Sequence, residues 1–254
     1  MDSLRLDGLV TLISGTSQGI GAAVALGFAA RGARVMMTSR AATDDPPESV
    51  AAARAQGEVD YLQLDVTDRA ACARVVAETI QRFGRLDCLI CNAGIYPRVP
   101  FEEMQPADWD AMLATNLDGA FNLCTAATPH FVARRYGKII TVSSINVRIV
   151  QPGRAHYVAS KMGLVGLTRG LARDLGAHGV RANCILPGAV LTEGELRDHP
   201  DQAAVLARVN ALQCIPGRIE GRDIEPTFAF FASPASDAIT GQSLAVDLGW
   251  TFDA

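Results

Sequence analysis

Cysteine, positive charge and long apolar runs are all scarce in this sequence. The 254 residues include six cysteines, without the spacing of a disulfide framework, which excludes a disulfide-stapled scaffold. The net charge of −4 and the pI near 5.6 exclude a broadly basic face for nucleic acid. No stretch approaches the roughly 18 apolar residues that cross a bilayer. We therefore expect a chain that binds neither nucleic acid nor membrane.

A secretion signal and a metal site are also not indicated. The N-terminal MDSLRLDGLV has no long apolar run before a small-residue cleavage site, so we expect a cytoplasmic protein. Cys88 and Cys91 form a C-x-x-C, but on a strand residues three apart point to opposite faces. No pair at metal-ligand spacing occurs among the histidines, which are His130, His156, His178 and His199. We expect no metal.

Short β-prone runs alternate with longer Ala-rich segments that have helical spacing. This rhythm predicts an α/β fold, and the non-alternating runs suit strands buried on both faces of a parallel sheet. The expected strands are Leu9 to Ser14, Arg34 to Thr38, Val59 to Leu64, Leu86 to Cys91, Lys138 to Ser143, Val180 to Leu186 and Leu244 to Val246. The expected helices are Ile20 to Ala30, Asp68 to Phe83, Asp108 to Tyr136 and Ala155 to Ala177, followed by a final helix before the last strand.

Residue types at the element ends agree with this division. Asp68 and Asp108 are expected to be N-caps. Left-handed C-cap positions are expected at the glycines between helix and strand, which are Gly32, Gly84, Gly137 and Gly179. The segment TDDPPE, residues 43–48, is expected to be a loop.

No linker divides the chain, so residues 1–254 are predicted to form a single domain. Residues 187–221 interrupt the rhythm with a mixed helical stretch. Long loops at the carboxyl ends of strands hold ligands in open α/β sheets, so this segment is predicted to be a substrate-binding insertion. The alternative is a plain surface insertion.

The first strand ends in a glycine-rich turn, SGTSQGIG. Gly15, Gly19 and Gly21 let a pyrophosphate approach backbone N–H groups at a helix N-terminus. The alternative is a tight turn without a ligand. The same residues contain G-x-S-x-G, the spacing of a hydrolase nucleophile elbow around Ser17. An elbow on the first strand leaves no upstream strand-helix loop for the oxyanion hole, which disfavours hydrolysis.

Tyr157 precedes Lys161 by four residues, a spacing that places both side chains on one face of a helix. A nearby cation favours the phenolate and lowers the pKa of a tyrosine toward the range of proton transfer. The pair is common by chance, so its meaning depends on the motifs around it.

Those motifs resemble the short-chain dehydrogenase/reductase family from Leu9 to Val246. The matching segments, in order, are SGTSQGIG, LDVTD, CNAG, NLDG, VSS, YVASK and PGAVLT. The resemblance implies a single doubly wound, Rossmann-type domain with a parallel seven-stranded sheet flanked by helices. It also implies a homo-oligomer, usually a tetramer, and hydride exchange with a nicotinamide cofactor.

The resemblance assigns four catalytic residues, Asn116, Ser144, Tyr157 and Lys161. Tyr157 would exchange a proton with the substrate oxygen, and Ser144 would hydrogen-bond that oxygen. Lys161 would hold the nicotinamide ribose and depress the pKa of Tyr157, while Asn116 would position a water for a proton relay.

The same transfer assigns the cofactor contacts, including Tyr157 and Lys161 themselves. The phosphates would lie on Gly15, Ser17, Gln18, Gly19, Ile20 and Gly21. Asp65 and Val66 would flank the adenine, and Asn92, Ala93 and Gly94 would lie under the adenosine ribose. The nicotinamide would contact Pro187, Gly188, Val190 and Thr192.

Cofactor choice is predicted from the end of the second strand. NAD-using relatives carry Asp there, where this chain has Ser39 followed by Arg40, and a cation favours the 2′-phosphate of NADP(H). Gln18 stands where many NADP-using relatives carry a second basic residue, so NAD(H) is the alternative cofactor.

Three departures from the family pattern are Ser14 for the usual Thr, Cys91 for the first Asn of NNAG, and DLGW at residues 247–250 for a DGG ending. Leu248 there removes a glycine near the expected subunit contacts, which weakens the expectation of a particular assembly.

The substrate is expected to be a small molecule with a carbonyl or alcohol group. Its pocket is predicted to be apolar with a few polar anchors, lined by Ile95, Tyr96, Arg98, Asn146, Val147, Arg154, Leu191 and Leu196. The leading hypothesis is an NADP(H)-dependent ketone reductase. The alternatives are an NAD-dependent alcohol or diol dehydrogenase and a non-catalytic cofactor-binding regulator.

Overall fold

The computed structural model describes residues 4–252. Within them, seven parallel strands form one sheet in the order β3-β2-β1-β4-β5-β6-β7. The strands are β1 (Val10–Ser14), β2 (Arg34–Ser39), β3 (Val59–Gln63), β4 (Cys88–Cys91), β5 (Gly137–Val142), β6 (Val180–Pro187) and β7 (Ser243–Val246). The predicted strands are confirmed, with boundaries that differ by one or two residues.

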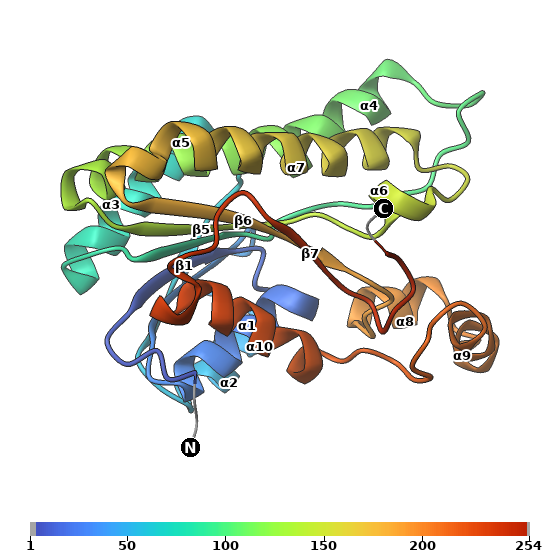
Figure 1. Ribbon diagram of the computed structural model, residues 1–254, viewed down its shortest axis with the longest axis horizontal. Helices are drawn as coiled ribbons and strands as arrows, with labels where there is room; N and C mark the ends of the chain where they lie inside the picture. Colours follow the sequence, from blue (N-terminus) through green and yellow to red (C-terminus); the bar gives the residue numbers. More distant parts are fainter. Residues whose placement is uncertain (1–3, 253–254) are drawn as a thin grey trace.

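Two layers of helices cover the sheet, and Figure 1 shows one layer above it and one below. The upper layer contains α3 (Arg69–Phe83), α5 (Gly119–Arg134) and α7 (Ala155–Leu175). The lower layer contains α1 (Gly19–Ala30), α2 (Glu48–Arg54) and α10 (Gly221–Ala232). Each layer packs on its own apolar core, because side chains alternate between the faces of every strand. The doubly wound α/β fold predicted from the sequence is confirmed.

Cys88 and Cys91 illustrate this alternation. Cys88 belongs to the core beneath the sheet and Cys91 to the core above it, so the two thiols diverge as expected. Cys91 instead lies 3.9 Å from the sulfur of Cys124 on α5. Burial raises the pKa of the Cys88 thiol, which keeps it protonated.

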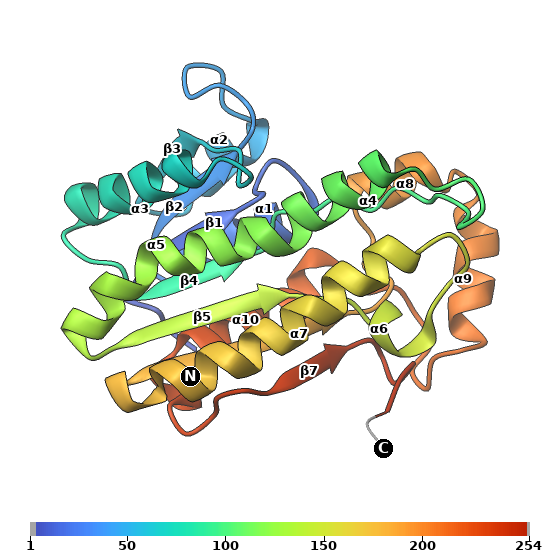
Figure 2. The ribbon, with the colours of Figure 1, turned by 90° about the horizontal axis from the view of Figure 1, so that it is seen from above.

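The strand order reverses between β1 and β4, where Thr11 pairs with Cys88 on one side of β1 and with Val35 on the other. Connections from β1 and β4 therefore leave in opposite directions and open a crevice at the carboxyl ends of the strands. Figure 2 shows the remaining helices at this end. They are α4 (Pro106–Leu113), α6 (Asn146–Ile149), α8 (Glu193–Asp198) and α9 (Gln202–Asn210).

The helix expected over residues 108–136 is divided. A π-helical turn at Ala114–Asp118 separates α4 from α5. Asp108 is not the N-cap of α4, because Gln105 holds that position and Pro106 begins the helix. Asp108 is the third helical residue, and its carboxylate accepts a 2.9 Å hydrogen bond from the Gln105 N–H.

Other expected end signals are mostly present. The Asp68 carboxylate caps α3 through a 3.0 Å bond from the Ala71 N–H. Gly32, Gly84 and Gly179 have the expected positive φ. Gly137 does not: Arg135 takes the left-handed conformation, and Gly137 lies in β5, where a Cβ would come within 2.5 Å of the Phe131 ring. The loop expected after β2 ends one residue earlier than predicted, because Glu48 begins α2.

The insertion at residues 187–221 contains α8 and α9. A parallel bridge between Val190 and Ile219 closes it at its base. Thr192 caps α8 by accepting from the Glu195 N–H at 3.2 Å, and Asp201 caps α9 by accepting from the Ala204 N–H at 3.0 Å. The insertion therefore lies over the carboxyl ends of the strands, and the Val190–Ile219 bridge fixes its two ends to each other.

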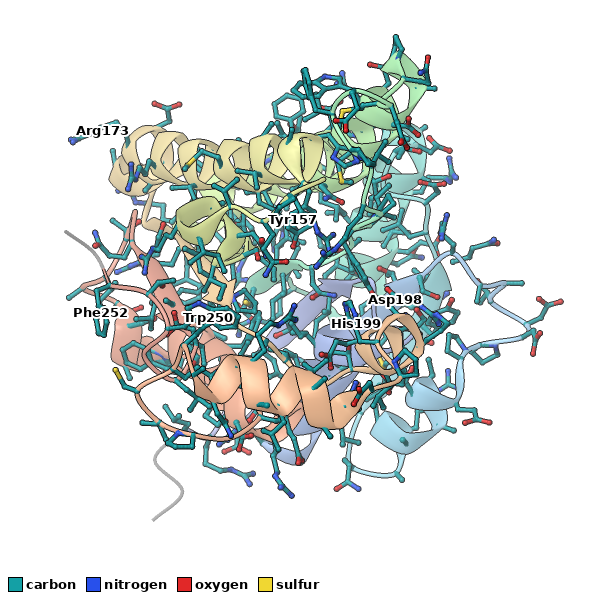
Figure 3. The ribbon with its side chains drawn as sticks, turned by 90° about the vertical axis from the view of Figure 1, so that its right-hand side faces the viewer. Tyr157, Arg173, Asp198, His199, Trp250 and Phe252 are labelled. Carbon is teal, nitrogen blue, oxygen red and sulfur yellow. The ribbon has the colours of Figure 1, made fainter. Side chains whose placement is uncertain are left out.

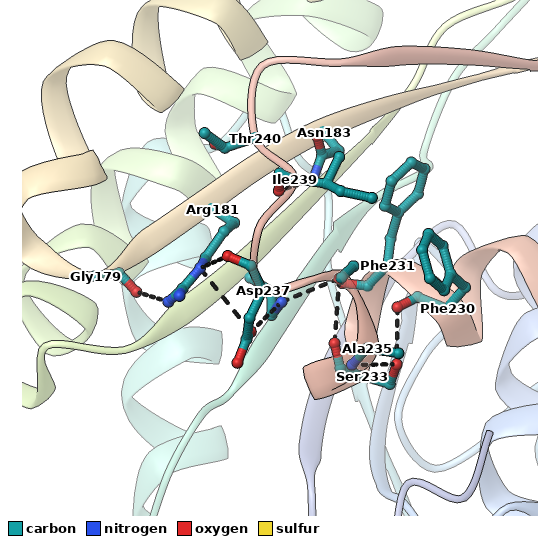
Figure 4. A network of polar contacts seen from close by, with 12 residues as sticks. Gly179, Arg181, Asn183, Phe230, Phe231, Ser233, Ala235, Asp237, Ile239 and Thr240 are labelled. Atoms are coloured by element: carbon teal, nitrogen blue, oxygen red, sulfur yellow. Dashed lines mark hydrogen bonds and ion pairs between the residues drawn. The ribbon is translucent and has the colours of Figure 1, made fainter. Parts of the chain in front are cut away.

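A polar network ties the chain together at the opposite, amino end of the sheet. Arg181 on β6 donates to the Asp237 main-chain oxygen at 2.9 Å and to the Gly179 oxygen at 2.8 Å (Figure 4). Lys138, which is 1% exposed on β5, forms a 2.6 Å ion pair with Asp237 and a 3.0 Å bond to Ser236. This network is structural, because it is at the end of the sheet away from the crevice.

Among residues 4–252, no helix is long and apolar enough to cross a membrane. The same residues contain no group of three or more His, Cys, Asp or Glu side chains placed to hold a metal ion.

Candidate active site

A cavity of about 490 Å³ lies at the carboxyl ends of the strands, between the insertion and the start of α7. Figure 3 looks toward this region, with Tyr157 on one side, Asp198 and His199 on another and Trp250 on a third. The cavity is lined by most of the residues predicted for the cofactor: Gly15, Ser17, Gln18, Gly19, Ile20, Ser39, Arg40, Asp65, Val66, Asn92, Ala93, Gly94, Tyr157, Lys161, Pro187, Gly188, Val190 and Thr192.

The glycine-rich turn after β1 is built so that its backbone packs closely. Gly15 has a φ of +72°, and a Cβ there would lie 2.7 Å from the Ala93 Cα. A Cβ on Gly21 would lie 2.3 Å from the Gly15 carbonyl oxygen. Asn92 fastens the turn from β4, because its side-chain amide donates to the carbonyls of Ser14 at 3.0 Å and Gly15 at 2.9 Å. Only glycine fits these positions.

Ser14, which replaces the family's usual threonine, keeps a hydroxyl that joins two segments. Its Oγ accepts hydrogen bonds of 3.1 Å from the main-chain N–H groups of Asn92 and Ala93. The turn after β1 and the CNAG segment after β4 are thus held against each other across the floor of the cavity.

The N-terminus of α1 fits an anionic group. The N-cap residue, Gln18, makes no side-chain cap hydrogen bond, so the first N–H groups of α1 are left for partners from elsewhere in the chain or for a ligand. The N–H of Gly19 donates a 2.8 Å hydrogen bond to a carboxylate oxygen of Glu193. A negatively charged oxygen is therefore already held where the phosphates of a dinucleotide would be placed. The residues present fit a nicotinamide dinucleotide.

The two residues predicted to select the cofactor, Ser39 and Arg40, have different environments at the end of β2. The Ser39 hydroxyl is buried and lies 2.8 Å from the hydroxyl of Tyr61 on β3. Arg40 is exposed at the edge of the cavity. Its charge helps to lower the pKa of Asp65, mainly lowered by the hydrogen bonds from Thr67. The Ser39 hydroxyl is thus engaged within the protein, whereas the Arg40 side chain is exposed.

Tyr157, Ser144 and Lys161 meet in the cavity, as the sequence predicted. Tyr157 and Lys161 lie one turn apart on α7, and Ser144 follows β5. The Lys161 ammonium is 5.7 Å from the centre of the Tyr157 ring. It donates a 2.8 Å hydrogen bond to the Val142 carbonyl oxygen. A phenol, a hydroxyl and an ammonium therefore line the same part of the cavity.

Asn146 orients the Ser144 hydroxyl. Ser144 Oγ accepts from the main-chain N–H of Asn146 at 3.1 Å and from its side-chain amide at 3.3 Å. A hydroxyl has two acceptor lone pairs and one proton, so these bonds leave the proton free to donate. Ser144 is thereby set up as a hydrogen-bond donor toward Tyr157 and the cavity.

The pKa of Tyr157 is raised rather than depressed. Burial is the largest cause, and the hydrogen bond from Ser144 and the charge of Arg154 oppose it. The groups that shift this pKa do not include Lys161, whose ammonium is bound to the Val142 carbonyl. Burial also lowers the pKa of Lys161 itself to about 8.

Arg154 lies against Tyr157 one turn before it on the chain. Its guanidinium carbon is 5.3 Å from the centre of the Tyr157 ring, and its Nη1 donates to the Tyr96 carbonyl oxygen. The sequence placed Arg154 in the substrate pocket but missed this contact with the phenol.

Asn116 is 1% exposed in the π-helical turn and does not line the cavity. Its Oδ1 accepts from the Ile95 N–H at 2.8 Å, and its Nδ2 donates to the Ile95 carbonyl at 2.9 Å and to Ser160 Oγ at 3.1 Å. The side chain therefore holds the segment after β4 in place. A water-positioning role for Asn116 stays a prediction.

Four further residues predicted for the site lie outside this cavity. Gly21 lies beneath the glycine-rich turn, and Val147 packs in the small core around Ile145. Leu191 and Leu196 line a second hollow against α1 and α2 instead. The backbone at Leu191 is fixed by a 2.7 Å bond from its N–H to the Ile219 carbonyl, and a substrate contact for these two leucines stays a prediction.

The remaining predicted pocket residues, Ile95, Tyr96, Arg98, Asn146 and Arg154, do line the cavity. The structure adds lining residues that the sequence did not single out: Gln151, Glu195, Asp198, His199, Arg208 and Trp250. Four of them, Glu195, Asp198, His199 and Arg208, are in the insertion that was predicted to bind the substrate. The substrate end of the cavity is therefore more polar and more charged than predicted.

The chain is similar to known proteins over most of its length. A family model described as enoyl-(acyl carrier protein) reductase matches residues 15–251. The 3-oxoacyl-(acyl-carrier-protein) reductase FabG of Thermotoga maritima is 35% identical over 248 residues, which cover 97% of this chain and 99% of that protein. Gluconate 5-dehydrogenase of Gluconobacter oxydans is 35% identical over 258 residues, covering 98% of this chain and 97% of that one.

Solved structures agree with these relatives. A putative short-chain alcohol dehydrogenase from Sinorhizobium meliloti superposes with a TM-score of 0.92 at 32% identity, covering 97% of this chain and 98% of that one. A variant of a short-chain dehydrogenase/reductase from Serratia marcescens gives 0.87 at 35% identity, covering 97% and 99%. The chain belongs to the short-chain dehydrogenase/reductase family and is an oxidoreductase acting on alcohol and carbonyl groups.

Proposed function

We propose that the chain is an NADP(H)-dependent reductase that converts a ketone to a secondary alcohol, with Tyr157 as the general acid. The observation that carries the proposal is the convergence of Tyr157, Ser144 and Lys161 in a cavity that also receives the N-terminus of α1. The names of the reductase relatives support this direction of reaction.

When bound, the cofactor supplies the hydride. The chain's own residues handle the substrate oxygen. Ser144 donates its proton in a hydrogen bond to that oxygen, which stabilises the negative charge that develops there. Tyr157, whose raised pKa keeps it protonated near neutrality, transfers its proton to the same oxygen. Lys161 holds the ribose next to the phenol from a buried position.

Selection of NADP(H) rests on Arg40. Its exposed guanidinium stands at the edge of the cavity, next to the end of β2, and can form charge-assisted bonds with a 2′-phosphate. The Ser39 hydroxyl is engaged by Tyr61 and offers no carboxylate that would repel that phosphate.

Fluorescence titration of the protein with NADPH and with NADH tests this without a substrate. We expect NADPH to bind at least tenfold tighter, a difference of about 1.4 kcal/mol. Arg40→Ala should lose about tenfold in NADPH affinity and little in NADH affinity. Arg54→Ala, which removes an exposed cation from α2, serves as the control. Equal or tighter binding of NADH by the unaltered chain would overturn the choice of cofactor.

An NAD-dependent alcohol or diol dehydrogenase is the second candidate. It is favoured by Gln18, which leaves the glycine-rich turn without a basic side chain, and by the gluconate 5-dehydrogenase relative. If NADH binds better, alcohols and diols should be screened with NAD.

Tyr157→Phe separates both enzymes from a non-catalytic cofactor-binding protein. We expect turnover to fall by a factor of about 10² to 10⁴ while NADPH affinity is retained. Tyr136→Phe, at the amino end of β5, should leave turnover unchanged. Undiminished turnover of Tyr157→Phe would refute the role of the phenol.

We also infer a homo-oligomer. Phe121 on α5 and Met162 on α7, in the upper helix layer, are 44% and 48% exposed, which supports burial of this layer against a second copy. Sedimentation equilibrium measures the oligomeric state.

We infer the cytoplasm as the location of the protein. The free, buried thiols of Cys72, Cys88 and Cys184 support this location.

A further inference from the structure

Two arginines meet at the substrate end of the cavity, and each donates to an uncharged oxygen. Arg154 donates to the main-chain carbonyl of Tyr96. Arg98 donates through Nη2 to the side-chain oxygen of Gln151 at 2.8 Å. Burial, and after it the charge of Arg98, disfavours the charged form of Arg154 and lowers its pKa. In the part of the chain that the structure describes, Arg154 Nε is buried without an acceptor.

The carboxylates around the same cavity already have cations of their own. Glu195 forms an ion pair with Arg218, and Asp198 lies 3.7 Å from Arg197. Asp198 adds a weak favourable charge at Arg154, the smallest of the influences on that guanidinium. Arg208 from α9 lines the cavity as well. Positive charge at this end of the cavity therefore exceeds the negative charge that faces it.

Arg154 is half-buried, and a cation withdrawn from water is costly unless an anion or a set of hydrogen bonds compensates it. Arg154 has one main-chain acceptor, an aromatic face and a like-charged neighbour. A planar guanidinium with free N–H groups matches a carboxylate, which it can bind through two parallel bonds. A substrate that brings a carboxylate would supply the missing acceptor.

We propose that the substrate carries a carboxylate, bound by Arg154 with the assistance of Arg98, so that the reaction interconverts a keto acid and a hydroxy acid. The proposal rests on the function proposed above and names its substrate class. The position of Arg154, 5.3 Å from the centre of the Tyr157 ring, places this carboxylate within a few carbon atoms of the reacting carbonyl. A substrate whose charge lies at the far end of a long carrier arm would not use Arg154.

The test compares matched pairs of ketones that differ only in charge. The probes are 4-oxopentanoate and 5-oxohexanoate, each with its methyl ester, and the N-acetylcysteamine thioester of 3-oxobutanoate as an uncharged acyl carrier. Values of kcat/KM are measured with NADPH and with NADH for the unaltered chain, Arg154→Gln, Arg154→Lys and Arg173→Gln. Arg173 is in the last turn of α7, about 24 Å along the helix from Tyr157 at about 1.5 Å per residue (Figure 3). Arg173→Gln therefore removes the same charge as Arg154→Gln, but far from the cavity.

The quantity compared is the ratio of kcat/KM for the acid to that for its ester. Both substrates use the same proton donor, so any effect of Arg154 on Tyr157 cancels in this ratio. We expect a ratio of about ten or more in the unaltered chain, a fall of about tenfold in Arg154→Gln, partial recovery in Arg154→Lys, and no change in Arg173→Gln.

A second measurement, inhibition by substrate analogues, uses only the unaltered chain and so does not depend on the folding of any variant. Pentanoate should inhibit the unaltered chain at lower concentration than pentanamide, and added salt should reduce the difference. If the esters or the thioester are reduced as well as the acids, the ketone reductase stands and the carboxylate site is refuted. If no ketone is reduced with either cofactor, the proposed function fails, and the inference fails with it.

Discussion

The main-chain N–H of Gly19 donates a 2.8 Å hydrogen bond to the carboxylate of Glu193, which lies 174 residues further along the chain. This contact joins the insertion to the glycine-rich turn at the place expected for the cofactor phosphates. A phosphate arriving there must displace the carboxylate and would be repelled by it. We therefore expect Glu193 to compete with the proposed dinucleotide for the N-terminus of α1.

Glu193→Gln should consequently strengthen cofactor binding. Because the contact is exposed, we expect a gain of about three- to tenfold in NADPH affinity, about 1 kcal/mol. Isothermal titration calorimetry measures it. Glu102→Gln, which removes an exposed carboxylate before α4, is the control for the change in net charge. Weaker binding in Glu193→Gln would show that the carboxylate assists the cofactor.

The pH dependence of alcohol oxidation should report the pKa of Tyr157. In the proposed mechanism oxidation requires the phenolate, so we expect kcat/KM to rise with pH until the pKa is reached. Burial places that pKa above its ordinary value of 10.0. The charge of Arg154 lowers this pKa, so Arg154→Gln should move the rising limb to higher pH. A neutral secondary alcohol avoids any effect on substrate charge. A limb that moves to lower pH would contradict this account.

Lys161→Met should stabilise the fold while it abolishes activity. Burial lowers the pKa of Lys161 from 10.5 to about 8, so the charged ammonium destabilises the folded state at pH 7. The shift corresponds to about 3 kcal/mol, and loss of the bond to Val142 offsets about 1 kcal/mol, which leaves a gain of about 2 kcal/mol. Urea unfolding without cofactor measures it.

The gain from Lys161→Met should shrink as the pH rises above about 8, because the folded protein then loses the proton from Lys161 while the unfolded chain keeps it up to 10.5. Unfolding at pH 7 and pH 9 tests this sign. Arg173→Met removes an exposed cation from the same helix and should change stability by less than about 0.5 kcal/mol.

Asp237→Asn should destabilise the amino end of the sheet. Lys138 is 1% exposed and would lose its counterion, while Asp237 itself is 42% exposed. Breaking a fully buried pair costs about 3–5 kcal/mol, and the exposure of Asp237 reduces the expected loss to about 1–3 kcal/mol. The urea midpoint should fall while the affinity for NADPH stays constant. Asp45→Asn in the exposed loop after β2 is the control, and an unchanged midpoint in Asp237→Asn would refute the pair's contribution.

Much of the fold and of the site followed from local patterns. Continuous apolar runs predicted the strands, because a sheet covered on both faces buries such runs. Glycines after helical segments predicted helix ends at Gly32, Gly84 and Gly179, and these three residues have positive φ. The i, i+4 spacing of Tyr157 and Lys161 placed both on one face of α7. These features depend on neighbours in the chain, so a single sequence determined them.

Other features depend on how distant segments pack. No pattern indicated that Glu193 would reach Gly19, that Arg154 would lie against the Tyr157 ring, or that Asn146 would orient Ser144. The direction in which Leu191 points also depends on its pairing with Ile219, because a strand-like backbone alternates its side chains from a register set elsewhere. The helices, the strands and the shared helix face of Tyr157 and Lys161 can be predicted from local sequence. The charges around these two side chains cannot, because they depend on contacts between segments far apart in the chain.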